Sequence, residues 1–122
     1  MYFRLFFSSI ALLTIYTVSE YVFTPMHLYF EIKWLDKPVH FLGGASVALF
    51  TIAMLNLWHK QVHMSNVLAG TVFIAILWEL YEFTHDVLVL RPWNGWFDSS
   101  TDVLFGILGG ALTYFLYKKK YL

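Results

Sequence analysis

The chain of 122 residues has no cysteine and few charged residues. Without thiols it has no disulfide, no thiolate metal site and no cysteine nucleophile. Charged residues make up 13% of the chain, whereas hydrophobic residues make up 59% and aromatic residues 20%. Soluble globular chains carry roughly 25% charged and about 45–50% apolar residues. The composition therefore excludes an ordinary soluble domain and favours an integral membrane protein.

Several functional signatures are also missing. The sequence has no glycine-rich phosphate loop, no basic patch interleaved with aromatic residues and no HExxH metal motif. NTP hydrolysis and nucleic-acid binding are therefore not expected. The first apolar stretch is not followed by a small-residue cleavage pattern, so we interpret it as a retained helix rather than a signal peptide.

Four apolar runs predict an all-α fold, an integral membrane bundle of four transmembrane helices in a single domain of residues 1–122. Each run approaches the ~20 residues that a helix needs to cross the hydrocarbon core. The predicted helices span residues 5–23, 39–58, 67–85 and 100–117. We expect Pro38 at the first position of the second helix, and Asp98, Ser99 and Ser100 as the residues that start the last one.

The charges are divided between the two ends of this predicted bundle. With four spans both termini lie on one side, which collects five basic residues, Arg4, Lys60, Lys118, Lys119 and Lys120. The other side has three, Lys33, Lys37 and Arg91. This excess predicts a multi-pass protein of the cytoplasmic membrane with both termini in the cytoplasm. All eight acidic residues fall on the opposite, non-cytoplasmic half: Glu20, Glu31, Asp36, Glu79, Glu82, Asp86, Asp98 and Asp102.

A faint internal repeat relates the second and fourth predicted helices. Asp36 precedes Gly43 and Gly44 by the same offsets at which Asp102 precedes Gly109 and Gly110. This pattern suggests two duplicated helical hairpins, as known in transporters. Small residues allow close helix packing in lipid. The set that predicts such packing is Gly43, Gly44, Gly106, Gly109 and Gly110.

Three predicted helix ends carry acidic pairs at helical spacing. Asp36 and His40 are four residues apart, Glu79 and Glu82 are three apart, and Asp98 and Asp102 are four apart, so each pair shares a helix face. An ionised carboxylate in hydrocarbon costs about 2.5–3.5 kcal/mol or more. We therefore expect these groups to face the bundle interior and to converge. Asp86 extends the stripe of Glu79 and Glu82.

The converging acids lead to a hypothesis of a divalent-metal site. Carboxylates and one imidazole suit Mg, Mn, Fe or Zn without selecting among them. The candidate ligands are His40, Glu79, Glu82, Asp98 and Asp102. Two alternatives stay open. The acids either lie in the wet interface, paired with Lys33, Lys37 and Arg91, or form a path for protons or cations, which four short helices would provide only as a homo-oligomer.

The segments DKPVHFLGG, WELYEF and WFDSSTDVLFGILGGAL resemble the VanZ-like family of small bacterial membrane proteins and its YjdF-type relatives. The matching positions are Asp36 and His40, Glu79 and Glu82, and Asp98 and Asp102. Members of that group often carry an arginine after the glutamate helix, for which Arg91 is a loose candidate, and an asparagine near the final glycines, where this chain has Phe105 or its neighbours. The resemblance implies a cell-envelope membrane protein associated with glycopeptide or lipid-linked processes.

The sequence therefore predicts a VanZ-like envelope protein with an acidic site at the outer face, which binds a cation or a lipid-linked ligand among the membrane lipids. As an enzyme it would use a metal as Lewis acid, with Glu79 or Glu82 as general base. The alternatives are a small proton- or cation-coupled transporter or channel subunit, and a structural accessory protein without catalysis.

Overall fold

The computed structural model describes residues 2–90, 92 and 95–122, which form helices and no strand. The first long helix is α1 (Tyr2–Val18), continued by the π-helical turn η1 (Ser19–Phe23). The short helix α2 (Leu28–Glu31) follows, and then the three long helices α3 (Asp36–Leu57), α4 (Met64–Leu88) and α5 (Trp96–Lys118). Four spans are long and apolar enough to cross a bilayer. The predicted all-α fold of four transmembrane helices is confirmed.

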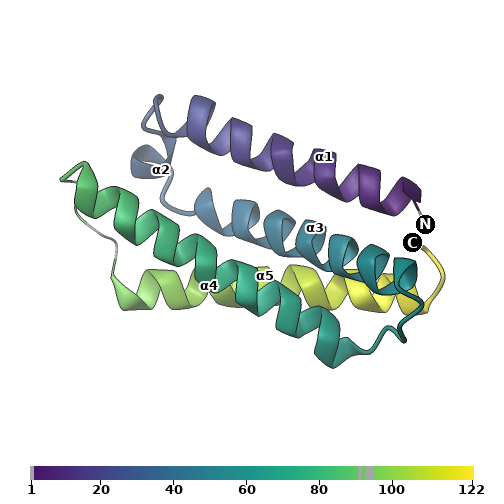
Figure 1. The fold of residues 1–122 in the computed structure, drawn as a ribbon. Coiled ribbons are helices and arrows are strands. Elements are labelled where there is room, and N and C mark those ends of the chain that lie inside the picture. The colour runs from purple at the N-terminus through teal and green to yellow at the C-terminus, as the bar shows by residue number, and fades with distance from the viewer. Residues whose placement is uncertain (1, 91, 93–94) are drawn as a thin grey trace.

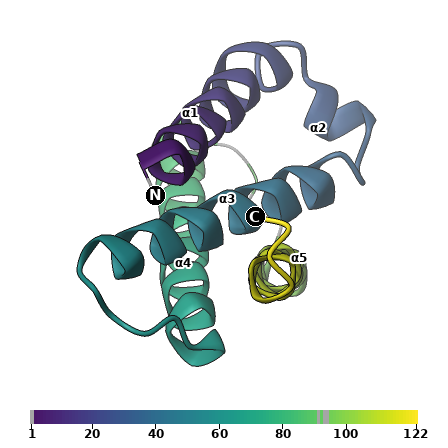
Figure 2. The same cartoon turned by 90° about the vertical axis from the view of Figure 1, so that its right-hand side faces the viewer.

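Helix α3 lies at the centre of the bundle. It packs most extensively against α5 and also contacts α1 and α4 (Figure 2). Both chain termini lie at one end of the bundle, whereas α2, the end of α4 and the start of α5 lie at the other (Figure 1). The N-terminal ends of α3 and α5 and the C-terminal end of α4 therefore meet at the end remote from the termini, where the sequence gathers its acids.

The interior and the exterior of the bundle are both apolar. Ala48, Ile52, Val67 and Tyr114 form the buried core in the half nearer the termini. Large hydrophobic side chains also cover the outside; Phe73, for example, is 62% exposed. In water such a surface would be costly, but lipid tails are as apolar as the core, so these side chains suit a bilayer-facing surface.

Most of the helices extend a few residues beyond the predicted ends. Helix α5 begins at Trp96 rather than at Asp98, Ser99 or Ser100, and Gly95 precedes it with φ 96°. Ser100 caps nothing; its hydroxyl donates back to the carbonyl of Trp96 at 2.6 Å. Pro38 is the third residue of α3 rather than the first. It is tolerated there because the first turn of a helix has no intrahelical acceptors for its N–H groups.

Glycines bring α3 and α5 into backbone contact. A Cβ on Gly44 would collide with the backbone of Gly106, and one on Gly109 would collide with the carbonyl of Phe41. The predicted close packing of small residues is confirmed at these three glycines. Gly110 instead faces Thr71 of α4, and a Cβ on Gly43 would meet nothing within 4 Å. Gly43 and Gly109, equivalent in the repeat, thus have different surroundings, and the duplication stays a prediction.

Candidate functional site

Three helices deliver polar side chains to one buried cluster, defined here as the acidic cluster of Asp36, His40, Glu79, Glu82 and Asp102. At ~1.5 Å per residue, His40 lies about 6 Å inside the start of α3, and Asp102 about 9 Å inside the start of α5. On the same scale Glu79 lies about 13 Å before the end of α4. These side chains of the cluster therefore lie within α3, α4 and α5, about one to two and a half turns from the helix ends, rather than in the connecting loops.

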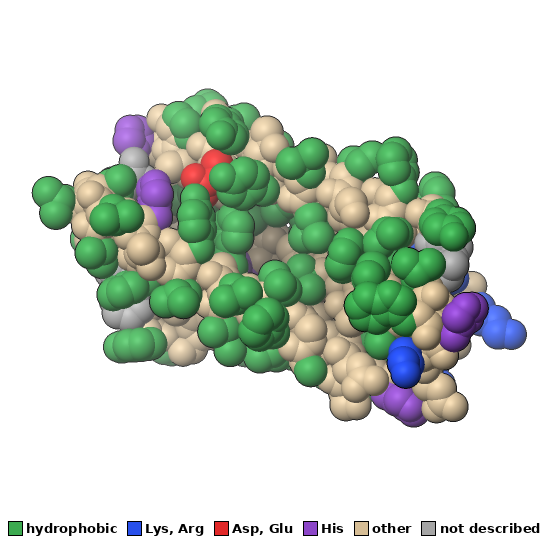
Figure 3. Space-filling view, viewed as in Figure 1, with side chains coloured by type: hydrophobic (Ala, Val, Ile, Leu, Met, Phe, Trp, Pro, Cys, Tyr) green, Lys and Arg blue, Asp and Glu red, His purple; other side chains and the backbone are tan. Residues whose placement is uncertain are grey.

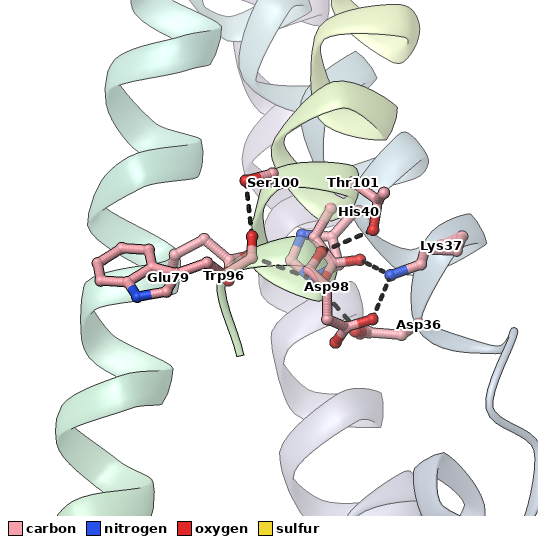
Figure 4. Close-up of polar contacts among 9 residues, drawn as sticks. Asp36, Lys37, His40, Glu79, Trp96, Asp98, Ser100 and Thr101 are labelled. Carbon is pink, nitrogen blue, oxygen red and sulfur yellow. Dashed lines mark hydrogen bonds and ion pairs between the residues drawn. The ribbon is translucent and has the colours of Figure 1, made fainter. Parts of the chain in front are cut away.

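Lys37 provides the first counter-charge. Its Nζ donates to Asp98 Oδ1 at 2.8 Å and to Asp102 Oδ1 at 2.5 Å, so that α3 is tied to α5 (Figure 4). The Asp102 side chain is only 2% exposed, whereas that of Asp98 is 34% exposed. The expectation that lysine would pair with the acids was therefore right for Lys37, and its contact with Asp102 is largely buried.

His40 lies at the centre of the acidic cluster. Its Nε2 is 3.3 Å from Asp36 Oδ1, 3.7 Å from Glu79 Oε1 and 3.9 Å from Asp102 Oδ2. These carboxylates come from α3, α4 and α5, and Figure 4 shows His40 among labelled residues of all three helices. One ring nitrogen carries at most one proton and can donate to one acceptor at a time. The imidazole alone therefore cannot satisfy three carboxylates.

Two atoms of this arrangement are buried without a hydrogen-bond partner. They are His40 Nε2 and Glu79 Oε1, which face each other across 3.7 Å. A buried polar atom without a partner costs about 1–3 kcal/mol, and more when the group is charged. Such atoms are rare in folded proteins, and a bound ion, water or ligand is one way to give them a partner. These two mark the inner edge of the candidate site.

The distances around His40 Nε2 are compatible with coordination of a metal ion. Ligand atoms about 2.0–2.2 Å from a tetrahedral Zn²⁺ lie ~3.3–3.6 Å from one another. The separations around His40 Nε2 are close to that range. Two overlapping triads, Asp36–His40–Asp102 and His40–Glu79–Glu82, each offer ligand atoms that all lie within 4.8 Å of one another. Both triads share His40, so an ion could be held on either side of the imidazole.

The remaining predicted site residues lie outside these triads. Asp98 is paired with Lys37. Asp86 lies 3.7 Å from His85 Nδ1, with 24% of its side chain exposed, near the end of α4. Arg91 falls outside the residues that the structure describes. Of the predicted ligands, the structure thus brings together His40, Glu79, Glu82 and Asp102, and adds Asp36.

Tyr29 is a neighbour of the cluster that sequence reasoning missed. It lies on α2, where its hydroxyl is 2.5 Å from the hydroxyl of Ser19 in η1. Burial, together with the nearby carboxylates of Asp36 and Glu82, raises the pKa of Tyr29 to about 12, although the hydrogen bond with Ser19 opposes the shift. The short helix therefore brings a neutral phenol near the acidic cluster. No spacing pattern in a four-residue helix would have revealed it.

A family model described as "Predicted membrane protein (DUF2238)" matches residues 1–120. The chain belongs to this family. Membership agrees with the four membrane-length helices and covers every residue of the acidic cluster. No curated protein and no solved structure matches the chain. The VanZ-like resemblance gains no support from these comparisons and stays a prediction.

Proposed function

We propose that this DUF2238-family protein binds a divalent metal ion inside the membrane, at the acidic cluster. The observation that supports this most strongly is that three carboxylates from separate helices converge on His40 Nε2. That nitrogen and Glu79 Oε1 have no hydrogen-bond partner. A metal ion would occupy the space between ligand atoms that repel one another or cannot pair. The proposal names His40, Glu79 and Glu82 as ligands, with Asp36 and Asp102 as the second carboxylate pair.

Charge balance supports a cation. Five carboxylates meet here, counting Asp98, against the single permanent positive charge of Lys37. If all were ionised and His40 were protonated, the net charge would be −5 + 2 = −3. Buried charge of one sign is too costly to leave uncompensated, so the group must take up protons or cations. A divalent ion removes two of these charges at once and uses the ligand atoms that lack partners.

An ion path through a single copy is less well supported. Beyond the cluster, toward the termini, the buried hydrophobic core of the described residues is formed by Ala48, Ile52, Val67 and Tyr114. The hydroxyl of Thr71, buried near this core, already donates to the carbonyl of Val67 at 3.0 Å. A permeating ion would cross this core without ligands. The buried acidic groups gather at one end of the bundle, which suits a binding site better than a channel.

The chemistry of such a site is that of a Lewis acid near the membrane surface. A bound metal would polarise an oxygen of a ligand, and Glu79 or Glu82 would serve as general base where it is not itself coordinated. We place the termini in the cytoplasm because of the excess of basic residues at their end, so the site faces outward. The VanZ-like resemblance agrees with a lipid-linked ligand in the cell envelope.

Metal titration of the purified protein tests this proposal. Zn²⁺ and Mn²⁺ are added to chelator-treated protein, and binding is followed by calorimetry and by elemental analysis after desalting. We expect one ion per chain. Glu79→Gln and Glu82→Gln keep the side-chain size and should each lower the affinity by ~10–100-fold or more, since even loss of a residue supporting a ligand has an effect of this size.

Asp86→Asn is the matched control, because it neutralises a carboxylate on the same helix outside the triads. It should bind metal like the unchanged protein. If the unchanged protein binds neither ion, or if Asp86→Asn and Glu82→Gln weaken binding equally, the metal proposal is wrong.

A further inference from the structure

A cleft runs beside the acidic cluster and is lined by residues of all four long helices. Its volume is about 90 Å³, several times the ~10–15 Å³ that one water requires. Its walls include Leu12 and Ile15 of α1, Val47 of α3 and Ile74 of α4. Gly43 and Gly106 leave room in it because they carry no side chain. The cleft is therefore a space built into the bundle beside the candidate metal site.

The cleft opens on an apolar face of the bundle. Figure 3 shows the surface hollowed between the regions of α1 and α4, on a face covered with hydrophobic side chains. Tyr16 of α1 and Trp78 of α4 both line the cleft and pack edge to face, with ring centroids 6.0 Å apart. This aromatic pair joins the two helices next to Glu79, so the free length of the cleft extends from there toward the middle of the bilayer.

The lining selects a hydrocarbon occupant. Apolar cavities of this kind stay dry, because a water inside them lacks the two to four polar partners it needs. Thr71, the buried hydroxyl in the wall, already donates to the carbonyl of Val67. The exception is His40, which lines the cleft with a side chain only 7% exposed and an Nε2 without a hydrogen-bond partner. The cleft is thus an apolar slot with one polar group in its wall.

We propose that the cleft between α1 and α4 binds one hydrocarbon chain of a bilayer lipid and thereby presents the polar end of that lipid to the His40 site. The direction is set by the bundle: the cluster lies a short distance below the helix ends, and the cleft continues toward the bilayer centre. A lipid of the leaflet at the cluster's end would lie in this direction, with its chain along Val47 and Ile74. The inference rests on the proposed metal site for its chemistry, and names a membrane lipid as the substrate class.

Photo-crosslinking in a defined membrane tests the inference. The full chain is placed in phosphatidylcholine vesicles that contain phosphatidylcholine with a diazirine in the middle of one acyl chain, and adducts are mapped by mass spectrometry. Outward residues such as Phe73 will be labelled by surrounding lipid in any case. Val47 is 7% exposed and Thr71 is 0% exposed, so labelling of these two requires a chain inside the cleft. We expect adducts on both.

Gly43→Leu is the deciding variant. A Cβ at this position meets nothing within 4 Å, so the new side chain can extend into the cleft without forcing α3 and α5 apart. We expect it to abolish labelling of Val47 and Thr71 while leaving that of Phe73 unchanged. Leu42→Phe is the matched control: it adds bulk at the neighbouring residue, which is 54% exposed and outside the cleft, and should label like the unchanged protein.

The outcomes separate the two proposals. Absence of adducts on Val47 and Thr71 in the unchanged protein, or their persistence in Gly43→Leu, overturns lipid binding in the cleft, whatever the metal titration shows. Cleft labelling that Gly43→Leu abolishes, with one metal ion still bound by that variant, supports both. If the cleft is labelled but the protein binds no metal, the proposed metal-binding function is wrong. The lipid is then not the substrate of a metal site, and that part of the inference is overturned.

Discussion

Replacing Lys37 by methionine should destabilise the protein strongly, because the change removes the ammonium group between two carboxylates. Methionine keeps much of the unbranched apolar stem but cannot donate. Asp102, whose side chain is 2% exposed, then loses its 2.5 Å partner. Asp98, 34% exposed, keeps access to solvent. The consequence of the substitution therefore falls mainly on Asp102.

The magnitude follows from the burial of each pair. Removing one partner of a buried ion pair costs about 3–5 kcal/mol, because an uncompensated charge is left behind. Lys37 is itself 20% exposed, which favours the lower end of that range. The more exposed pair with Asp98 adds at most ~1 kcal/mol. We expect Lys37→Met to lower the free energy of unfolding by about 3 kcal/mol.

The assay is equilibrium unfolding in mixed micelles, followed by helical circular dichroism as the share of denaturing detergent rises. A chelator is present throughout, so that no metal ion replaces the ammonium. Lys37→Met combined with Asp102→Asn removes the orphaned charge and should recover about 1–2 kcal/mol, within the usual range of coupling between residues in contact. Lys33→Met is the control on an exposed lysine of the same segment and should stay within about 0.5 kcal/mol of the unchanged protein.

Two results would refute this reasoning. One is a Lys37→Met protein as stable as the Lys33→Met control. The other is a double variant whose loss equals the sum of the two single losses, which would mean that Lys37 and Asp102 do not interact in the folded protein.

Two further predictions concern the packing and the neighbourhood of the cluster. Gly44→Ala should lower the free energy of unfolding by about 1–3 kcal/mol, since its methyl group would meet the backbone of Gly106, whereas Gly43→Ala should be neutral or gain up to ~1 kcal/mol of helix propensity. Equal effects of the two substitutions in the same unfolding assay would contradict the packing. Tyr29, with its pKa raised to about 12, should form phenolate only near pH 12, so its contribution to stability is complete below pH 10 and is lost as the pH rises through 12. Ultraviolet titration of the unchanged protein and of Tyr29→Phe checks this, because the difference between the two curves reports the ionisation of Tyr29. A difference centred near pH 10 instead of pH 12 would contradict the prediction.

Local spacing was enough to predict the four helices and which polar residues share a helix face. Asp36 with His40, and Glu79 with Glu82, share helix faces because their separations are close to one turn, and this holds whatever the tertiary fold. The high cost of charge in lipid then predicted that these faces turn inward. Burial of His40 and Asp102 agrees with that argument.

The partners of those faces could not be predicted from spacing. Lys37 contacts residues 61 and 65 positions away, a pairing that depends on the close approach of α3 and α5 at Gly44 and Gly106. Which lysine would pair with which acid was therefore open. The start of the last helix was predicted too late, because Asp98 and the residues after it have the pattern of a helix start. Helix α5 instead begins with Trp96 and Phe97, before that pattern.

The position of the acidic cluster at one end only makes the direction of insertion decisive. The bundle offers its carboxylates to a single aqueous compartment and to a single leaflet, since the opposite end carries the termini and the lysine-rich tail. A copy inserted in the opposite orientation would expose the same side chains to the ions of the other compartment and to the lipids of the other leaflet. If the positive-inside rule sets the orientation, the basic residues near the termini would select the environment that the buried acids encounter, from the opposite end of the bundle.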